Sequence, residues 1–162
     1  MENEISDSKR LTMTILMTPD LVNFSGNVHG GAILRYLDQA AYSCAARYSG
    51  QYVVTLSVDQ VFFREPIHVG ELVTFKSSVN FTGKTSMEIG IKVIAEDTRS
   101  KTIRHVMSSF FTMVSVDKDR KPCEVPALIL ENDVERRRYE EAKIRRKLRA
   151  DYETASRTVR QR

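Results

Sequence analysis

The polar residues best placed to do chemistry lie at the start and in the middle of one apolar helix. Apolar side chains at three- and four-residue spacing predict this helix from about residue 30 to residue 49. Gly30 and Gly31 begin it, where the unpaired N–H groups and the positive end of the helix dipole can hold negative charge. Asp38 follows among apolar neighbours such as Leu37. An unpaired carboxylate would be costly if buried there, which favours a functional role over a solvated one.

Nearby polar residues also have structural interpretations. Asn23 could simply cap its own loop, the commoner role of an isolated asparagine. His29 is tempting as a base, but a lone loop histidine is more often structural. His68 and His105 show no metal-ligand spacing, so we expect no metal. The absence of a G-x-S-x-G elbow disfavours a serine hydrolase, and the chain has no G-x-x-x-x-G-K-[ST] phosphate loop.

Strands must hold this helix in place. Short turns around Glu65-Pro66, Gly70 and Gly83 separate segments with alternating or β-branched and aromatic residues, which predicts a mainly antiparallel sheet. The expected strands are 10–17, 53–63, 73–81, 87–93 and 103–116. The helix has one apolar stripe with small residues in its second half, so it can lie close against the sheet, and Gly50 suits a left-handed cap. The expected architecture is an α+β fold with an antiparallel sheet wrapped around one long central helix.

Composition limits the class of protein. The 162 residues fit one domain, and 41% apolar with 28% charged residues allows a real core. No run approaches the ~18 apolar residues of a membrane span, and the acidic start is unlike a secretory signal. Cys44 and Cys123 are too few for a disulfide framework, so we expect a reduced, cytoplasmic protein. Residues 1–9 read as disordered and 10–130 as the folded domain.

The net charge of +4 belongs entirely to the C-terminal segment, 131–162, which holds eleven Lys/Arg and seven Asp/Glu. Such a segment can bind phosphates or nucleic acid, but it is more often a solvated helical face. We predict a charged helix and tail, with no nucleic-acid or membrane partner. Its few apolar residues predict a thin docking stripe made of Val134, Tyr139, Ile144 and Leu148.

Several segments together resemble one enzyme family. They are NFSGNVHGGAILRYLDQAAYSCAARYSG, VDQVFFREPIHVGELVTF, GKTSMEIGIKV and SSFFTMVSVD followed by VPALI. Over roughly residues 10–130 they resemble the hotdog-fold acyl-CoA thioesterases, in particular the cytosolic and brain-type acyl-CoA hydrolases and their short bacterial relatives. The charged C-terminal helix also has the look of that family.

The resemblance implies a site and a reaction. Asn23 would position water or the thioester, Asp38 would activate water as general base, and the N–H of Gly31 would polarise the thioester carbonyl. The products would be a fatty acid and coenzyme A, which is part of the substrate, so no cofactor is expected. The family builds its sites across a dimer interface and suggests three such dimers in a hexamer.

The spacing adds its own constraint on assembly. Asp38 follows Gly31 by seven residues, which places the two on one helix face but ~10 Å apart along the axis. One carbonyl cannot easily reach both the Gly31 amide and a water held by Asp38 of the same helix. An antiparallel helix from a second subunit would bring another Asp38 into place.

The coenzyme A half of the substrate needs basic groups and turn amides near one edge of the site. The candidates are His29 and Gly30 in supporting roles, together with Arg64, Lys84, Thr85 and Ser86. A plain hairpin turn is as good an interpretation for each residue of the 84–86 turn taken singly. Two other functions stay open: a hotdog dehydratase, although its helix or loop histidine has no obvious match here, and a non-catalytic module that binds acyl groups or nucleotides.

Overall fold

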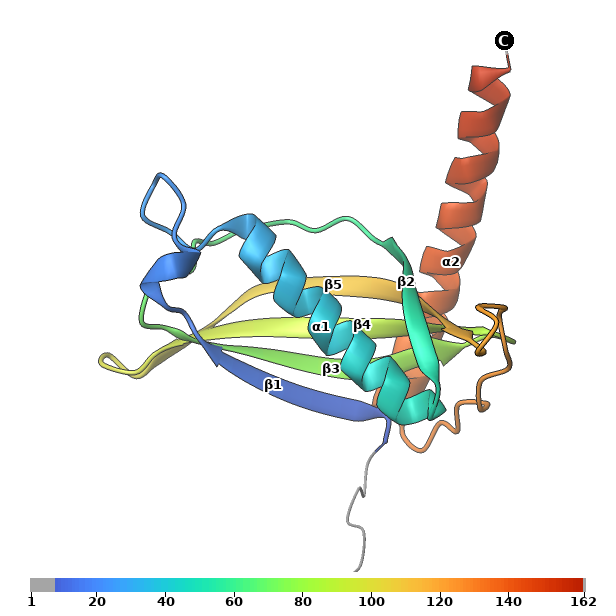
Figure 1. Cartoon of the computed structure of the whole chain (residues 1–162), viewed down its shortest axis with the longest axis horizontal. Helices are drawn as coiled ribbons and strands as arrows, with labels where there is room; N and C mark the ends of the chain where they lie inside the picture. The colour runs from blue at the N-terminus through green and yellow to red at the C-terminus, as the bar shows by residue number, and fades with distance from the viewer. Residues whose placement is uncertain (1–7, 162) are drawn as a thin grey trace, which may run out of the picture.

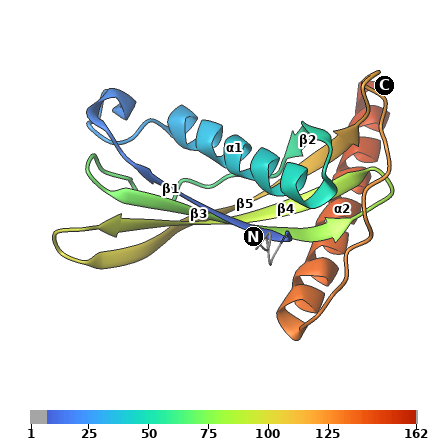
Figure 2. The same cartoon turned by 60° about the horizontal axis from the view of Figure 1, so that its bottom comes forward.

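The computed structural model describes residues 8–161, in which one antiparallel sheet curves around a long helix (Figures 1 and 2). The strands run in the order β1-β3-β4-β5-β2 across the sheet, so β1 and β2 form its two edges. Their bounds are β1 Arg10–Leu16, β2 Tyr52–Val58, β3 Leu72–Thr82, β4 Ser86–Asp97 and β5 Thr102–Val116. The expected α+β hotdog architecture is confirmed.

Helix α1 (Gly30–Ser49) lies along the inner face of the sheet. Its buried side chains recur at three- and four-residue spacing and become small after Leu37, which lets the second half lie close to the strands. Gly50 ends the helix at φ 67, the left-handed conformation that the sequence predicts. This helix therefore presents its N-terminus at one end of the sheet and Asp38 near its middle.

Strand β2 is shorter than the sequence predicts. It ends at Val58, whereas β-branched and aromatic residues predict a strand through Phe63. Asp59 still donates its N–H to the carbonyl of Phe110 on β5, but its carboxylate turns to Arg149 at 2.7 Å. The chain beyond it, with Phe62 and Phe63 exposed, leaves the sheet and returns toward the start of α1.

The outer face of the sheet has one close contact that depends on a glycine. The side chain of Asn80 on β3 lies directly over Gly90 on β4 and accepts a hydrogen bond from the Ser78 hydroxyl at 2.8 Å. A Cβ atom at position 90 would overlap the amide nitrogen of Asn80. The bare backbone of Gly90 thus makes room for a buried polar side chain.

The C-terminal helix α2 (Asp133–Arg160) crosses that outer face, opposite α1, and extends past the sheet edge (Figure 1). The docking stripe predicted for it is wrong in most of its members. Ile144 and Leu148 are 60% and 61% exposed, and Val134 also faces solvent. Only Tyr139 packs as expected, with its ring 5.0 Å from that of Phe81.

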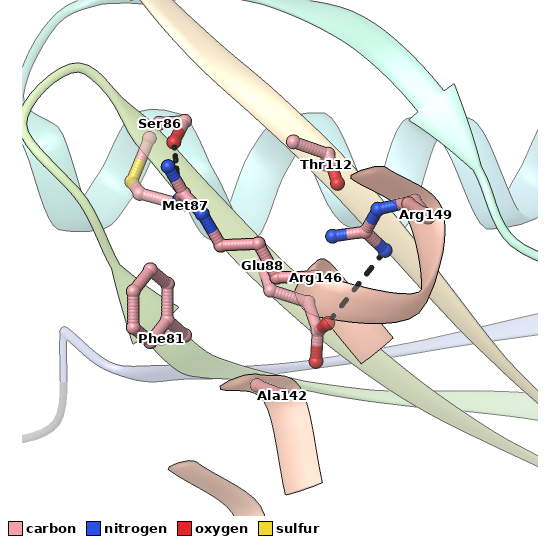
Figure 3. Close-up of a pocket in the computed structure, with 8 residues that line it drawn as sticks. All are labelled: Phe81, Ser86, Met87, Glu88, Thr112, Ala142, Arg146 and Arg149. Carbon is pink, nitrogen blue, oxygen red and sulfur yellow. Dashed lines mark hydrogen bonds and ion pairs between the residues drawn. The ribbon is translucent and has the colours of Figure 1, made fainter. Parts of the chain in front are cut away.

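Charged side chains instead hold α2 to the sheet, around buried Ala142. Glu88 on β4 is 3% exposed and receives Arg145 at 2.7 Å, while the Arg145 guanidinium lies 3.6 Å from the centre of the Phe110 ring. Figure 3 shows Arg149 directed to the same carboxylate, 4.0 Å away. A buried carboxylate must be paired, so the helix binds where the sheet carries Glu88.

A second ion-pair cluster joins the two ends of the described chain. Glu135, which is buried in α2, accepts from Lys9 at 3.1 Å and from Arg10 at 3.0 Å. Lys9 is therefore held in place, although the sequence predicts disorder for residues 1–9. Residues 1–7 of that predicted segment lie outside the described residues. Between Ser8 and Gln161, no helix has the length and apolar content that a bilayer span requires.

Candidate active site

Asp38 and Thr55 form a hydrogen-bonded pair between α1 and β2. The Thr55 hydroxyl donates to Oδ1 of Asp38 at 2.6 Å, a length typical of a hydroxyl bonded to a carboxylate. Both residues are exposed in the single protomer. The second carboxylate oxygen, Oδ2, has no protein donor among residues 8–161, so it is available to a water molecule.

Exposed apolar side chains also occur on α1 and β2 at this open edge of the sheet. They come from both elements: Leu34 and Tyr42 on α1, and Tyr52, Val54, Leu56 and Val58 on β2. Leu56, next to Thr55, is 68% exposed. Exposed apolar side chains beside an unpaired edge strand are typical of an interaction surface. The carboxylate therefore lies within a surface suited to being covered.

Asn23 sits in the loop before α1 and is held by that loop. Its Oδ1 accepts three hydrogen bonds, from the Ser25 N–H at 2.9 Å, the Ser25 hydroxyl at 2.7 Å and the Asn27 N–H at 3.2 Å. Gly26 closes the turn at φ 82, a left-handed conformation. The loop-capping role is thus real. It fixes the oxygen of Asn23 and leaves the Nδ2 hydrogens without an acceptor in the described chain.

The start of α1 offers fewer free amides than its sequence suggests. His29 is the N-cap, and its Nδ1 accepts the N–H of Gly31 at 2.9 Å, so the ring carries its proton on Nε2 when neutral. The N–H of Gly30 has no acceptor within residues 8–161. A ligand oxygen at this helix end therefore meets a free Gly30 donor and a Gly31 donor shared with His29.

The remaining predicted residues divide between two ends of the sheet. Arg64 lies over the ring of Phe62, 5.7 Å from its centre, and the adjacent Phe63 packs against Gly30 at the start of α1. Lys84 and Thr85 form the turn after β3, an 11-residue strand that spans ~35 Å, and Ser86 begins β4 at the same end of the sheet. The 84–86 turn therefore cannot join Gly30 and Arg64 within one protomer.

Sequence reasoning missed Thr55 as a site residue. Its only signal was a hydroxyl residue among the apolar residues of VVTLSV. Its contact with Asp38 depends on the packing of β2 against α1, including the register shift between Thr55 and Ser57. No group of three metal-ligating side chains occurs in the part of the chain that the structure describes. The chemistry on offer is a positioned carboxylate and a helix start with amide donors.

Comparisons with known proteins agree on one family. The model of the Thioesterase superfamily matches residues 25–102. Protein VdlD of Helicobacter pylori is 44% identical over 146 residues, covering 90% of this chain and 83% of that protein. A crystal structure of an acyl-CoA hydrolase from Bacillus cereus superposes with a TM-score of 0.87 at 32% identity, covering 94% of this chain and 93% of that one.

Two further solved structures show a ligand and an assembly. The Staphylococcus aureus acyl-CoA hydrolase in complex with butyryl coenzyme A superposes with a TM-score of 0.85 at 28% identity, covering 95% of this chain and 93% of that one. Alanine variants of that enzyme at one asparagine, one aspartate and one threonine have also been solved. A hexameric hotdog-fold thioesterase from Campylobacter jejuni has a TM-score of 0.66 at 33% identity, covering 70% of this chain and 88% of that one.

Proposed function

This chain belongs to the hotdog-fold acyl-CoA thioesterases, and we propose that it hydrolyses acyl-CoA with a water molecule activated by Asp38. The observation that carries the proposal is the Thr55–Asp38 hydrogen bond of 2.6 Å inside an exposed apolar surface. The bond orients one carboxylate oxygen and leaves the other to hold water. A covered apolar surface would exclude bulk solvent from that water.

The S. aureus variants support the same three residue types. Their asparagine, aspartate and threonine are separated by 15 and then 17 positions. Asn23, Asp38 and Thr55 have the same separations in this chain. We therefore assign Asp38 as the general base, Asn23 as the group that orients water or thioester, and Thr55 as a positioning residue that acts through Asp38.

The reaction follows from these groups. The water oxygen attacks the thioester carbon while its proton passes to Oδ2 of Asp38. Negative charge develops on the former carbonyl oxygen, and the N–H groups of Gly30 and Gly31 at the start of α1 stabilise it. The intermediate then expels the coenzyme A sulfur, which takes the proton from Asp38. A fatty acid and coenzyme A leave, and the carboxylate is regenerated.

A site shared between two subunits would bring a helix start and an Asp38 carboxylate close enough to act on one thioester. Gly31 and Asp38 lie ~10 Å apart along one helix, too far to serve one carbonyl and its attacking water. The apolar surface around Asp38 borders the β2 edge, so a second copy can cover it and bring its own α1 alongside, antiparallel. Such an isologous dimer has two equivalent sites, each with the helix start of one subunit and Asp38 of the other. Three dimers would form the proposed hexamer.

The same arrangement gives the coenzyme A residues a common location. Antiparallel packing brings the end of the sheet that carries Lys84, Thr85 and Ser86 in one subunit toward the end that carries Arg64 in the other. We propose that the phosphates of coenzyme A bind there, between Arg64 of one subunit and the 84–86 turn of its partner. Charge-assisted contacts to phosphate favour these basic and hydroxyl groups.

The first test is hydrolysis by Asp38→Asn protein. Release of free thiol from several acyl-CoA substrates measures turnover, and Asp119→Asn, at an exposed turn, is the matched control. General-base catalysis contributes ~10²–10⁴-fold, so Asp38→Asn should lose most of kcat while the control retains it. Near-normal turnover of Asp38→Asn would remove this residue from the mechanism. A dehydratase would change its acyl substrate without releasing thiol.

The second test is complementation between inactive subunits. Asn23→Ala protein is mixed with Asp38→Ala protein under conditions that allow subunit exchange. If Asn23 of one subunit serves with Asp38 of the other, each mixed dimer has one intact site, and activity returns. If both residues of a site come from one chain, every site keeps a defect and no activity returns, which would refute the shared site.

A further inference from the structure

A basic cleft of about 170 Å³ lies on the outer face of the sheet, where β3, β4 and β5 meet α2. Four cationic side chains line it, and Glu141 is the one carboxylate among its lining residues. The cations are Lys76, Lys92, Arg137 and Arg138. We propose that this cleft binds a phosphate-bearing anion, at a site separate from the Asp38 carboxylate of the same protomer.

Two lysines in the floor of the cleft face each other across neighbouring strands. Lys76 on β3 is directly opposite Lys92 on β4 in the strand register, and both side chains are exposed on the outer face. Like charges directly opposite each other destabilise a sheet. Within residues 8–161 neither lysine forms an ion pair, so no direct carboxylate contact there offsets this repulsion. A bound anion between the two ammonium groups would offset it.

The wall of the cleft adds positive charge. Arg137 donates to Glu141 at 2.8 Å, so the one lining carboxylate is already engaged. Arg138 reaches from α2 to the floor and donates to the Ser78 hydroxyl at 3.3 Å. The four cations and one carboxylate leave a surplus of three positive charges around one hollow.

Polar groups in the floor suit the oxygen atoms of a phosphate. Ser108 on β5 is directly opposite Lys92, and Asn80 lines the cleft further along β3. The Ser78 hydroxyl already donates to Asn80, so Ser108 and the Asn80 amide are the neutral donors on offer. The volume is below the ~300–1,000 Å³ of sites that enclose a drug-sized molecule. It therefore fits a phosphate or diphosphate group, with the rest of a larger ligand outside the cleft.

The cleft is on the face of the sheet opposite α1, so it cannot contact the thioester held by Asp38 of its own chain. Two sources of phosphate share the required chemistry. One is a free phosphate compound, and the other is a phosphate group, of a coenzyme A molecule bound to a neighbouring subunit, that does not contact Arg64 or the 84–86 turn. The two sources are distinguished by whether loss of the lysine pair weakens the binding of coenzyme A as well as that of inorganic pyrophosphate.

The test compares the full chain with a Lys76→Gln/Lys92→Gln variant. Lys118→Gln/Lys121→Gln is the matched control, because it removes the same charge from an exposed turn elsewhere. Calorimetric titration with inorganic pyrophosphate at constant ionic strength should show binding to the wild type and the control. The Lys76/Lys92 variant should bind about tenfold more weakly or worse, since charge-assisted contacts are lost.

Thermal unfolding provides a second readout. The difference in melting temperature between the variant and the wild type should change sign when pyrophosphate is added. Without anion, the Lys76/Lys92 variant should melt above the wild type, because the like-charge repulsion is gone. With saturating pyrophosphate the wild type should melt above the variant, because the bound anion stabilises the wild type more. Absence of pyrophosphate binding to the wild type, or equal affinity in the variant, would overturn the proposal.

Parallel titration with coenzyme A identifies the source. An equal loss of coenzyme A affinity in the variant, with a raised KM and unchanged kcat, assigns the phosphate to coenzyme A. Unchanged coenzyme A affinity assigns it to a free phosphate compound. Binding is measured directly, so these results do not depend on whether Asp38 is the catalytic base.

Discussion

Replacement of Thr55 by valine removes one hydroxyl and preserves the shape of the side chain. In the structure that hydroxyl makes one side-chain hydrogen bond, the 2.6 Å contact to Asp38. Valine is also favoured in strands, so β2 should keep its place at the edge of the sheet. The change therefore isolates the orientation of the Asp38 carboxylate.

The expected loss follows from the length and charge of this bond. At 2.6 Å it falls in the charge-assisted range, and such bonds contribute about 1.5–3 kcal/mol when they are shielded from water. Each 1.36 kcal/mol is a factor of ten in rate. If a partner subunit covers the site, Thr55→Val should lower kcat/KM by about 10- to 150-fold. An exposed bond in a lone protomer would contribute much less.

The assay is steady-state release of thiol from acyl-CoA, with kcat and KM measured separately. A positioning role predicts a loss in kcat, an almost unchanged KM and recovery by Thr55→Ser, which restores the hydroxyl. Thr14→Val, at an exposed threonine on the other edge strand, is the matched control. Wild-type kcat in Thr55→Val, or no recovery in Thr55→Ser, would refute this reasoning.

Three further changes test what holds the fold. Glu88→Ala should lower the free energy of unfolding by about 3 kcal/mol in chemical denaturation, because it leaves Arg145 without its partner; we take the low end of such costs since Arg145 keeps 20% exposure. Burial raises the pKa of Glu135, but hydrogen bonds from the Glu131 N–H and Lys9 outweigh it and hold the pKa below 4.5. The ionised Glu135 carboxylate therefore stabilises the fold above pH 4.5, and this stabilisation is lost as the pH falls through the lowered pKa. The melting temperature of Glu135→Gln protein should accordingly depend less on pH in that range than that of the wild type. Gly50→Ala should cost about 1 kcal/mol in thermal unfolding because its φ of 67 is strained for alanine, and an unchanged melting temperature would contradict this.

The core elements were predictable because their patterns are local. The helix at residues 30–49 has a complete apolar stripe and a glycine cap, and the structure begins and ends it at those residues. The end of β2 was not predictable, since residues 59–63 keep strand-like composition while Asp59 is drawn to Arg149 on a distant helix. The prediction of which face of α2 docks on the sheet was wrong for a related reason. Its partner Glu88 reads as one polar position in an alternating strand, and only the fold shows that it is buried.

The candidate site divides in the same way. Asp38 stands out because it interrupts an apolar helix, and the glycine pair because it marks where that helix begins. The Asp38–Thr55 bond, the capping of Gly31 by His29 and the opposite locations of Arg64 and Lys84 depend on how distant segments pack. Patterns along the chain identify a residue that is unusual for its element. They do not specify its neighbour from another element.

The contact between Asn80 and Gly90 has a consequence for how this sequence can vary. The two positions are ten residues apart on neighbouring strands, and the side chain of one fills the space that a Cβ atom of the other would need. A side chain at position 90 requires the Asn80 amide to move out of its present place, and a smaller residue at position 80 avoids that cost. Homologues should therefore show paired substitutions here, with a side chain at 90 chiefly where 80 has lost its amide. An alignment deep enough to record both positions together would reveal this as covariation, although neither residue touches Asp38.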